Sequence, residues 1–133
     1  NRSDMVRIPM YKPGKEAASR LELRSPDPAC NPYLAFSAIL AAGLEGIERK
    51  YEVPVPTEED VSALSDAERA RRSIRQLPGS LGEAIALAAG SKLLREALGD
   101  HVFESFLRNK RIEYDQFRRA LTDYELKTYL PLL

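Results

Sequence analysis

The stretch Arg20-Leu21-Glu22-Leu23-Arg24, followed by Ser25-Pro26-Asp27-Pro28, alternates apolar and charged side chains with a period of two residues. This pattern predicts a β-strand that ends at the prolines, with the leucines on one face and Arg20, Glu22 and Arg24 on the other. A carboxylate flanked by guanidinium groups suits a surface that holds a cation beside an anion, because carboxylates bind Mg²⁺ or Mn²⁺ and arginines bind phosphate. The alternative is an ordinary solvated face, whose ion pairs contribute about 0–1 kcal/mol each.

A second strand is predicted for residues 5–9, where Val6 and Ile8 alternate with Arg7. Residues 11–15, Tyr-Lys-Pro-Gly-Lys, form a turn between the two strands. We expect both strands to join a sheet.

The rest of the sequence predicts helices. Asn31 is suited to cap a helix that has Pro32 in its first position and runs from residue 33 to about residue 50. This helix is apolar nearly all round, so we expect it to be buried. Gly43 and Gly46 lower its helix propensity, and we expect them to mark close packing of another backbone.

Further helices follow an extended, proline-rich connection at residues 51–56 and a short acidic turn at residues 57–64. The spacing of a capping box recurs at Ser65, Ser80 and Thr122, and Ser91 and Asp100 open two more helices. The predicted fold is mainly α, an α+β fragment with two short N-terminal strands and a bundle-like helical region. We divide it into a strand segment, residues 1–28, and a helical segment, residues 29–133.

Composition limits the possible functions. The 133 residues carry 20 basic and 20 acidic side chains, and this zero net charge argues against a general nucleic-acid or anionic-membrane binder. No apolar run approaches the roughly 18 residues of a membrane span. The single Cys30 favours a reducing, cytoplasmic setting, and the single His101 excludes a histidine-based metal cage within this chain. Because the chain begins with Asn1 and not Met, we expect it to be a segment of a longer polypeptide.

Several motifs together carry a resemblance to a known family. They are Asn1-Arg2-Ser3, Val6-Arg7-Ile8-Pro9, the strand at residues 20–28, Asn31-Pro32-Tyr33-Leu34-Ala35-Phe36, Leu77-Pro78-Gly79-Ser80-Leu81 and Lys110-Arg111-Ile112-Glu113-Tyr114. In this order they resemble the C-terminal part of the catalytic domain of bacterial and archaeal type I glutamine synthetases. The resemblance covers essentially the whole chain. It implies an enzyme that joins glutamate and ammonia with ATP, through γ-glutamyl phosphate, and that forms a homo-oligomer, usually a dodecamer.

The resemblance also implies roles for individual residues. Arg2, Arg7 and Arg20 match arginines that bind the ATP phosphates, and Arg2 also matches a catalytic arginine at the transferring phosphate. Glu22 matches a carboxylate ligand of Mg²⁺ or Mn²⁺. Arg24 matches the catalytic arginine that holds the glutamate substrate or the acyl phosphate. We also expect the arginines to lower the pKa of Glu22.

Two departures from the family limit this transfer. The lysine that contacts adenine in relatives has only Lys15 as a candidate here. The regulatory tyrosine that is adenylylated in one branch is replaced by Ser62 or a neighbour, so we expect no regulation by adenylylation. The remaining metal ligands and the ammonia site are expected outside this chain, so the segment alone is predicted to be inactive.

Other functions stay open at this point. One alternative is a sister ligase that joins glutamate to a polyamine or another amine, and another is a non-catalytic fragment that only mediates oligomer contacts. We interpret His101 as a capping or surface residue, Cys30 as an inert thiol and the arginines at 69–72 as a solvated helix end. Tyr33 and Phe36 are expected to be core residues. The aromatic residues of the C-terminal region are expected to form a helix-packing stripe (Tyr114, Phe117, Tyr124, Tyr129).

Overall fold

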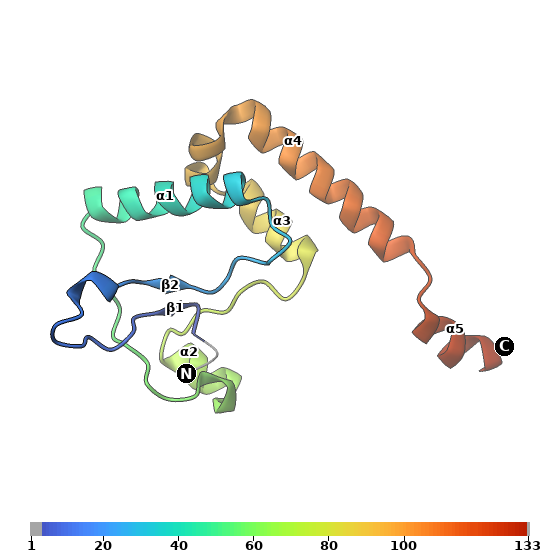
Figure 1. Cartoon of the computed structure of the whole chain (residues 1–133). Coiled ribbons are helices and arrows are strands. Elements are labelled where there is room, and N and C mark those ends of the chain that lie inside the picture. Colours follow the sequence, from blue (N-terminus) through green and yellow to red (C-terminus); the bar gives the residue numbers. More distant parts are fainter. Residues whose placement is uncertain (1–3, 133) are drawn as a thin grey trace. The chain divides into compact units, whose positions relative to one another are not determined.

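The computed structural model describes residues 4–132, and it confirms a mainly α fold with a small sheet. The described part contains two strands, five α-helices and short 3₁₀ turns (Figure 1). The chain divides into two compact units, Asn1–Gln76 and Leu77–Leu133. No helix in the described residues is long and apolar enough to cross a lipid bilayer. The first unit contains the predicted site, and each unit is described separately below.

The sheet of the first unit is a two-stranded antiparallel hairpin. Strand β1 (Val6–Arg7) pairs with β2 (Glu22–Leu23), so that Val6 lies opposite Leu23 and Arg7 opposite Glu22. Both strands are shorter than the predicted ranges 5–9 and 20–24. Because opposite residues in a pleated sheet point to the same side, the hairpin has one apolar and one charged face, as predicted.

Helix α1 (Pro32–Glu48) begins as its sequence predicts. The side-chain carbonyl of Asn31 accepts hydrogen bonds from the backbone N–H groups of Tyr33 and Leu34 at 3.0 and 3.3 Å. Pro32 occupies the first helical position, where it has no N–H that would need an intrahelical partner. The helix ends just before Lys50, whose positive φ of 51° turns the chain out of the helix.

The expected burial of α1 is wrong within this chain. None of its residues is buried, and Tyr33 and Phe36 are 82% and 69% exposed and are not core residues here. The expected backbone contacts of its glycines are also wrong, since a Cβ on Gly43 would meet nothing within 4 Å and one on Gly46 would meet only the Tyr51 side chain. The physical reason is that, within the first unit, no other described element packs an apolar surface against this helix.

The first unit ends with a short arginine-braced segment. The acidic turn is a 3₁₀ helix, η2 (Val61–Ala63), and α2 (Asp66–Arg71) follows it with Ser65 as its N-cap. The Arg69 guanidinium donates hydrogen bonds to the carbonyl oxygens of Val61 and Leu64 and to the Asp66 carboxylate. This arginine therefore ties η2 to α2 and is only partly exposed.

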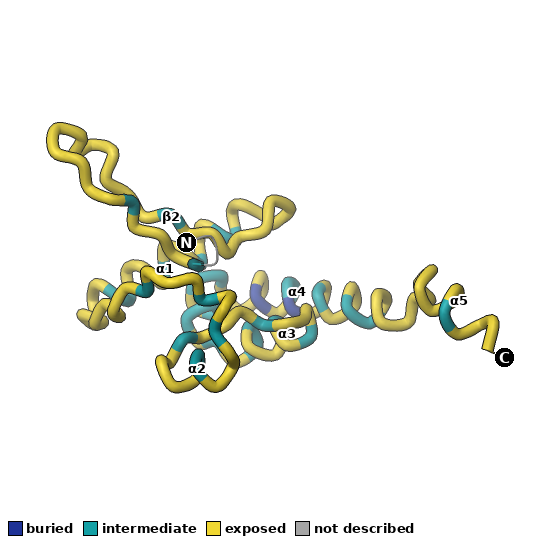
Figure 2. The backbone as a smooth tube through the Cα atoms, turned by 90° about the horizontal axis from the view of Figure 1, so that it is seen from below, coloured by how far each residue is buried: buried dark blue, intermediate teal, exposed yellow. Residues whose placement is uncertain are grey.

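The second unit contains the buried core of the described chain. Helices α3 (Leu81–Ala89) and α4 (Lys92–Arg119) pack together through Ile85, Phe103 and Leu107. Figure 2 shows that the dark-blue buried positions gather there, while most of the tube is yellow. Burying these three side chains stabilises the helix pair by about 1.5–3 kcal/mol for each residue.

Helix α4 contains the predicted break between two helices. Gly99 has φ 72° and ψ 155°, which is not a helical conformation, and Asp100 follows it as predicted. Arg95 spans the break, since it donates hydrogen bonds to Asp100 and Glu104 and lies 4.3 Å from the centre of the Phe103 ring. The kink is therefore held by charged and aromatic contacts on both sides.

Helix α5 (Asp123–Tyr129) starts with the predicted capping box. The Thr122 hydroxyl accepts from the backbone N–H of Glu125, and the Glu125 carboxylate accepts from the backbone N–H of Thr122. The predicted aromatic stripe is only partly correct. Tyr114 packs against the core, whereas the other members are exposed (Phe117, Tyr124 and Tyr129).

Candidate functional site: an arginine-clamped carboxylate

The predicted site residues meet on the charged face of the hairpin. Arg7 and Glu22 are directly opposite each other across the two strands, and Arg20 and Arg24 lie two residues before and after Glu22. The backbone N–H of Arg24 donates to the carbonyl oxygen of Met5 at 2.8 Å, which extends the pairing beyond the strands. The register therefore brings one carboxylate and three guanidinium groups together. Arg2, the remaining predicted site residue, lies outside the described residues.

Both oxygens of Glu22 are occupied by arginines. Arg7 Nη1 donates to Oε2 at 2.9 Å. Arg20 approaches the other oxygen with two donors, Nη2 at 2.7 Å and Nε at 3.1 Å from Oε1. Arg24 Nη2 lies 3.9 Å from Oε2, an ion-pair distance without hydrogen-bond contact. We call this group of Arg7, Arg20, Glu22 and Arg24 the arginine clamp.

The arginine clamp keeps its carboxylate ionised. The side chain of Glu22 is 27% exposed, and that of each arginine is more exposed. The hydrogen bond from Arg7, followed by that from Arg20, lowers the pKa of Glu22 below its ordinary value, as predicted. At neutral pH the site therefore combines one anionic oxygen donor with a surplus of cationic hydrogen-bond donors, which suits polyphosphate and carboxylate ligands.

The loop that joins the strands is ordered by a residue that sequence reasoning missed. Glu16 Oε1 accepts from the Tyr11 hydroxyl at 2.8 Å and from the backbone N–H of Gly14 at 2.9 Å. Position 14 requires glycine because its φ of +76° is a backbone conformation that other residues rarely adopt. The sequence feature that could have predicted this contact is the pair Tyr11 and Glu16 on either side of the Lys-Pro-Gly turn. Lys15, the candidate adenine contact, lies in this loop, and its role stays a prediction.

The chemistry of the clamp fits a divalent cation only in part. Carboxylate oxygens are the ligands that Mg²⁺ and Mn²⁺ prefer, so Glu22 is a suitable ligand. Within residues 4–132 no group of three or more acidic, histidine or cysteine side chains is placed to hold a metal ion. A cation at Glu22 would therefore take its other ligands from substrate, water or residues beyond those described.

The other candidate residues lie outside the clamp. His101 and Cys30 are both exposed, and Cys30 is a free thiol. The arginines at the end of α2 pair with acidic neighbours, since Arg71 contacts Glu68 and Arg72 contacts both Glu59 and Glu68. These ion pairs agree with the interpretation of a solvated helix end for Arg71 and Arg72. For Arg69 that interpretation is wrong, because its side chain is only 21% exposed and binds the carbonyl oxygens of Val61 and Leu64.

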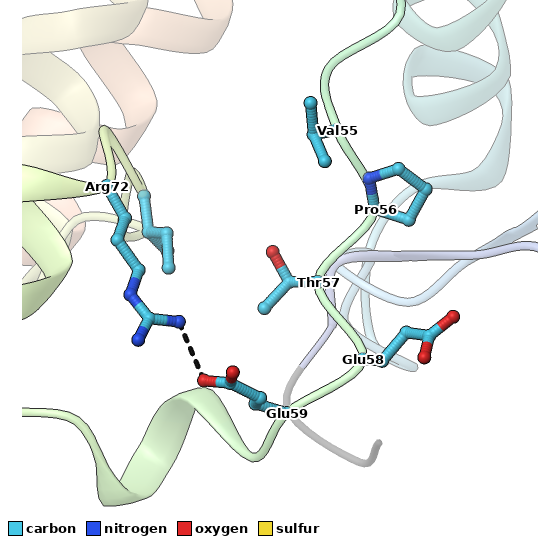
Figure 3. Close-up of a pocket in the computed structure, with 7 residues that line it drawn as sticks. Val55, Pro56, Thr57, Glu58, Glu59 and Arg72 are labelled. Carbon is cyan, nitrogen blue, oxygen red and sulfur yellow. Dashed lines mark hydrogen bonds and ion pairs between the residues drawn. The ribbon is translucent and has the colours of Figure 1, made fainter.

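An open surface pocket of about 510 Å³ lies in the proline-rich connection of the first unit (Figure 3). An ion pair between Arg72 and Glu59, at 2.6 Å, lies in its wall. In this pair the two charges neutralise each other. The described walls of the pocket are formed by residues 55–59, Arg72 and Ile74, and Arg7, Arg20, Glu22 and Arg24 are not among them. The clamp is therefore the better candidate site.

Comparison with known proteins agrees with the resemblance drawn from the motifs. Residues 1–129 match the family described as glutamine synthetase, catalytic domain. The chain belongs to the glutamine synthetase family. It is 52% identical over 132 residues to the glutamine synthetase of Mycolicibacterium smegmatis, covering 99% of this chain and 30% of that protein.

Archaeal glutamine synthetases are similar as well. Identity is 48% over 133 residues with the Methanosarcina mazei protein, covering all of this chain and 29% of the relative. With the Methanocaldococcus jannaschii protein the identity is 43% over 130 residues, which covers 98% of this chain and 28% of the relative. The chain thus spans about 30% of the length of the curated glutamine synthetases it matches, and the clamp lies within the matched region of the family.

Proposed function

We propose that the protein carrying this segment is an ATP-dependent glutamate–ammonia ligase that makes glutamine. Residues 1–133 would be the C-terminal part of its catalytic domain, with residues 1–28 contributing to the active site and residues 29–133 forming a helical segment. The observation that carries the proposal is the arginine clamp, which lies within the region that matches the glutamine synthetase catalytic domain. The whole protein is proposed to be a cytoplasmic homo-oligomer.

The proposed reaction has two steps. A carboxylate oxygen of glutamate attacks the γ-phosphorus of ATP, the bond to the bridging oxygen breaks, and ADP leaves. Ammonia then attacks the acyl carbon of γ-glutamyl phosphate, phosphate leaves, and the nitrogen loses a proton. Arg2, Arg7 and Arg20 would hold the phosphate oxygens, and Arg24 would hold the substrate carboxylate or acyl phosphate. Phosphoryl transfer relies mostly on such positioning and charge stabilisation.

Glu22 would supply one oxygen ligand to Mg²⁺ or Mn²⁺. When bound, the cation neutralises charge on the nucleotide phosphates. The low pKa of Glu22, caused by its hydrogen bonds from Arg7 and Arg20, supports this role because only the ionised carboxylate binds metal well. Since the clamp has a single carboxylate, we expect the 133-residue chain alone to have no ligase activity.

Substitution in the full-length protein tests this function. Glutamine formation and phosphate release are measured with glutamate, ATP, Mg²⁺ and ammonia, and a second reaction replaces ammonia with a diamine. We expect ammonia to be the acceptor and Glu22→Gln to lower turnover by at least about 100-fold, as for lost charge stabilisation in other sites.

Glu45→Gln is a matched control for this substitution. Glu45 has a similarly exposed side chain, at 25%, and contacts Arg49 at 3.0 Å, but it lies in α1 and outside the clamp. Unchanged turnover in Glu22→Gln would contradict the proposed site. Faster turnover with the diamine than with ammonia would favour the sister ligase.

A further inference from the structure

The loop between β1 and β2 is held by the side chain of Glu16. Its Oε1 accepts hydrogen bonds from the Tyr11 hydroxyl at 2.8 Å and from the backbone N–H of Gly14 at 2.9 Å. The hydrogen bond from its own backbone N–H, followed by those from Tyr11 and Gly14, lowers the pKa of Glu16 below its ordinary value. One ionised side chain therefore joins the start of the loop, its turn and the 3₁₀ turn η1 (Glu16–Ala18).

The 3₁₀ turn η1 leads directly to Arg20. It is closed by backbone hydrogen bonds from Ala18 to the Lys15 carbonyl oxygen at 2.9 Å and from Ser19 to the Glu16 carbonyl oxygen at 3.0 Å. The carbonyl oxygen of Ala18, the last residue of the turn, accepts a hydrogen bond from Arg20 Nη1 at 3.2 Å. The direction of the Arg20 side chain therefore depends on where η1 places this carbonyl group.

The guanidinium of Arg20 is held from two sides. Nη1 donates to the loop, while Nε and Nη2 donate to Oε1 of Glu22 at 3.1 and 2.7 Å. These contacts take one N–H from each nitrogen, and Nη1 and Nη2 each carry a second N–H. Two such N–H groups form the fork with which arginine binds a phosphate. Because the guanidinium is planar and rigid, contacts that fix its plane also fix the direction of this fork.

We propose that Glu16 is a positioning residue that acts on the reaction through Arg20. By holding the loop it fixes η1, and through the Ala18 carbonyl group it sets the direction in which Arg20 presents its fork. This inference rests on the proposed function, in which Arg20 holds phosphate oxygens of ATP, and it gives Glu16 itself no contact with a substrate. The Arg20 side chain is 56% exposed, so without these contacts it would sample several rotamers, and ATP would have to order it on binding.

Substitution of Glu16 in the full-length protein tests the proposal. Glu16→Ala removes both loop contacts, whereas Glu16→Gln keeps a carbonyl oxygen that can accept from Tyr11 and Gly14. We expect Glu16→Ala to raise the KM for ATP by about 3–10-fold, the cost of ordering one side chain, with kcat and the KM for glutamate unchanged. Glu16→Gln should bring the KM for ATP to within about twofold of the wild-type value. A merely structural role would lower the folded fraction and hence kcat, without this selective change in KM.

A second tyrosine–glutamate pair provides a matched control. The Tyr51 hydroxyl donates to Oε1 of Glu45 at 2.9 Å, away from the loop, and Tyr51 and Tyr11 are 58% and 59% exposed. Tyr51→Phe should leave the KM for ATP unchanged, whereas Tyr11→Phe should raise it because one of the two loop contacts is lost. Tyr11→Phe also replaces Glu16→Ala in the test if circular dichroism shows that Glu16→Ala does not fold.

A double-mutant cycle tests whether Glu16 acts through Arg20. Binding of a non-hydrolysable ATP analogue with Mg²⁺ is measured by calorimetry, so that inactive variants can be compared. Lysine has a single point donor and no fork to direct, so in an Arg20→Lys background Glu16→Ala should weaken binding by less than about twofold. Equal weakening in both backgrounds would refute action through Arg20.

The remaining outcomes separate this inference from the proposed function. If Arg20→Lys weakens binding of the analogue but Glu16→Ala does not, the role of Glu16 is refuted and the proposed function stands. If Arg20→Lys leaves the affinity unchanged, the phosphate-binding role of Arg20 falls, and the role of Glu16 falls with it. If the wild type neither binds the analogue nor forms glutamine, the proposed function itself is wrong.

Discussion

Gly82 in the first turn of α3 provides a sharp test of how the second unit packs. A Cβ built on Gly82 would lie 2.8 Å from Cζ, 2.9 Å from the hydroxyl oxygen and 3.0 Å from Cε1 of Tyr114. Carbon atoms prefer about 3.5–4.0 Å, so the ring would have to move by roughly 0.5–1 Å. Such overpacking costs about 1–3 kcal/mol, whereas alanine gains about 0.5–1 kcal/mol over glycine in a helix. Gly82→Ala should therefore destabilise the α3–α4 pair by about 0–2.5 kcal/mol.

The sign of this effect should reverse when the ring is removed. In a Tyr114→Ala background the added methyl meets no ring, and Gly82→Ala should stabilise the pair by about 0.5–1 kcal/mol. Native-state hydrogen exchange at the amides of Ile85 and Phe103 reports the opening free energy of this core in all four variants. The double-mutant cycle should give a coupling of at least about 1 kcal/mol. Equal effects of Gly82→Ala in both backgrounds would refute the packing described here.

Three further predictions concern the same unit. Leu107→Ala should lower the opening free energy of the core by about 2–5 kcal/mol in the same exchange measurement. Leu87→Ala, on the exposed side of α3, should change it by less than about 0.5 kcal/mol. Similar losses in the two variants would mean that the core is misassigned. Gly99→Ala should lower the free energy of unfolding by about 1–3 kcal/mol, because a side chain is strained at φ 72°. An unchanged melting curve would mean that residue 99 is helical. The hydrogen bonds from the Thr122 backbone and hydroxyl lower the pKa of Glu125. Their stabilisation of α5 is therefore complete above the ordinary pKa of about 4.3 and is lost as pH falls through the lowered value. α5 helicity, measured by NMR chemical shifts, should decline as the pH falls through that value. Glu125→Gln should remove this pH dependence, because its side chain does not titrate.

The charged face of the site could be predicted because its causes are local. Side chains two residues apart on a strand share a face whatever the rest of the protein does. The alternation of Arg20, Glu22 and Arg24 therefore predicted three of the four members of the clamp. The same reasoning predicted the N-caps at Asn31 and Thr122, which depend on the backbone within three residues.

The cross-strand partner of Glu22 was not predicted. The alternation suggested Arg20 and Arg24 as the groups that flank the carboxylate. The structure instead has Arg7 at 2.9 Å from Oε2, with Arg24 at 3.9 Å from the same oxygen. Which residue faces Glu22 is decided by the register of the hairpin, and a shift of one residue would move Arg7 to the other face. That register depends on the long loop ordered by Glu16, whose conformation the sequence pattern does not specify.

The burial of helix α1 could not be predicted from local sequence. Its sequence predicts burial, yet the apolar residues Phe36, Leu40 and Ile47 are all more than half exposed. Each such side chain leaves about 1.5–3 kcal/mol of burial energy unused. A helix that is apolar nearly all round indicates a buried position in the folded protein. This chain spans about 30% of the length of the relatives it matches. The start, end and cap of α1 depend on nearby residues and are correct, whereas its burial depends on surfaces that the other described residues of the first unit do not provide.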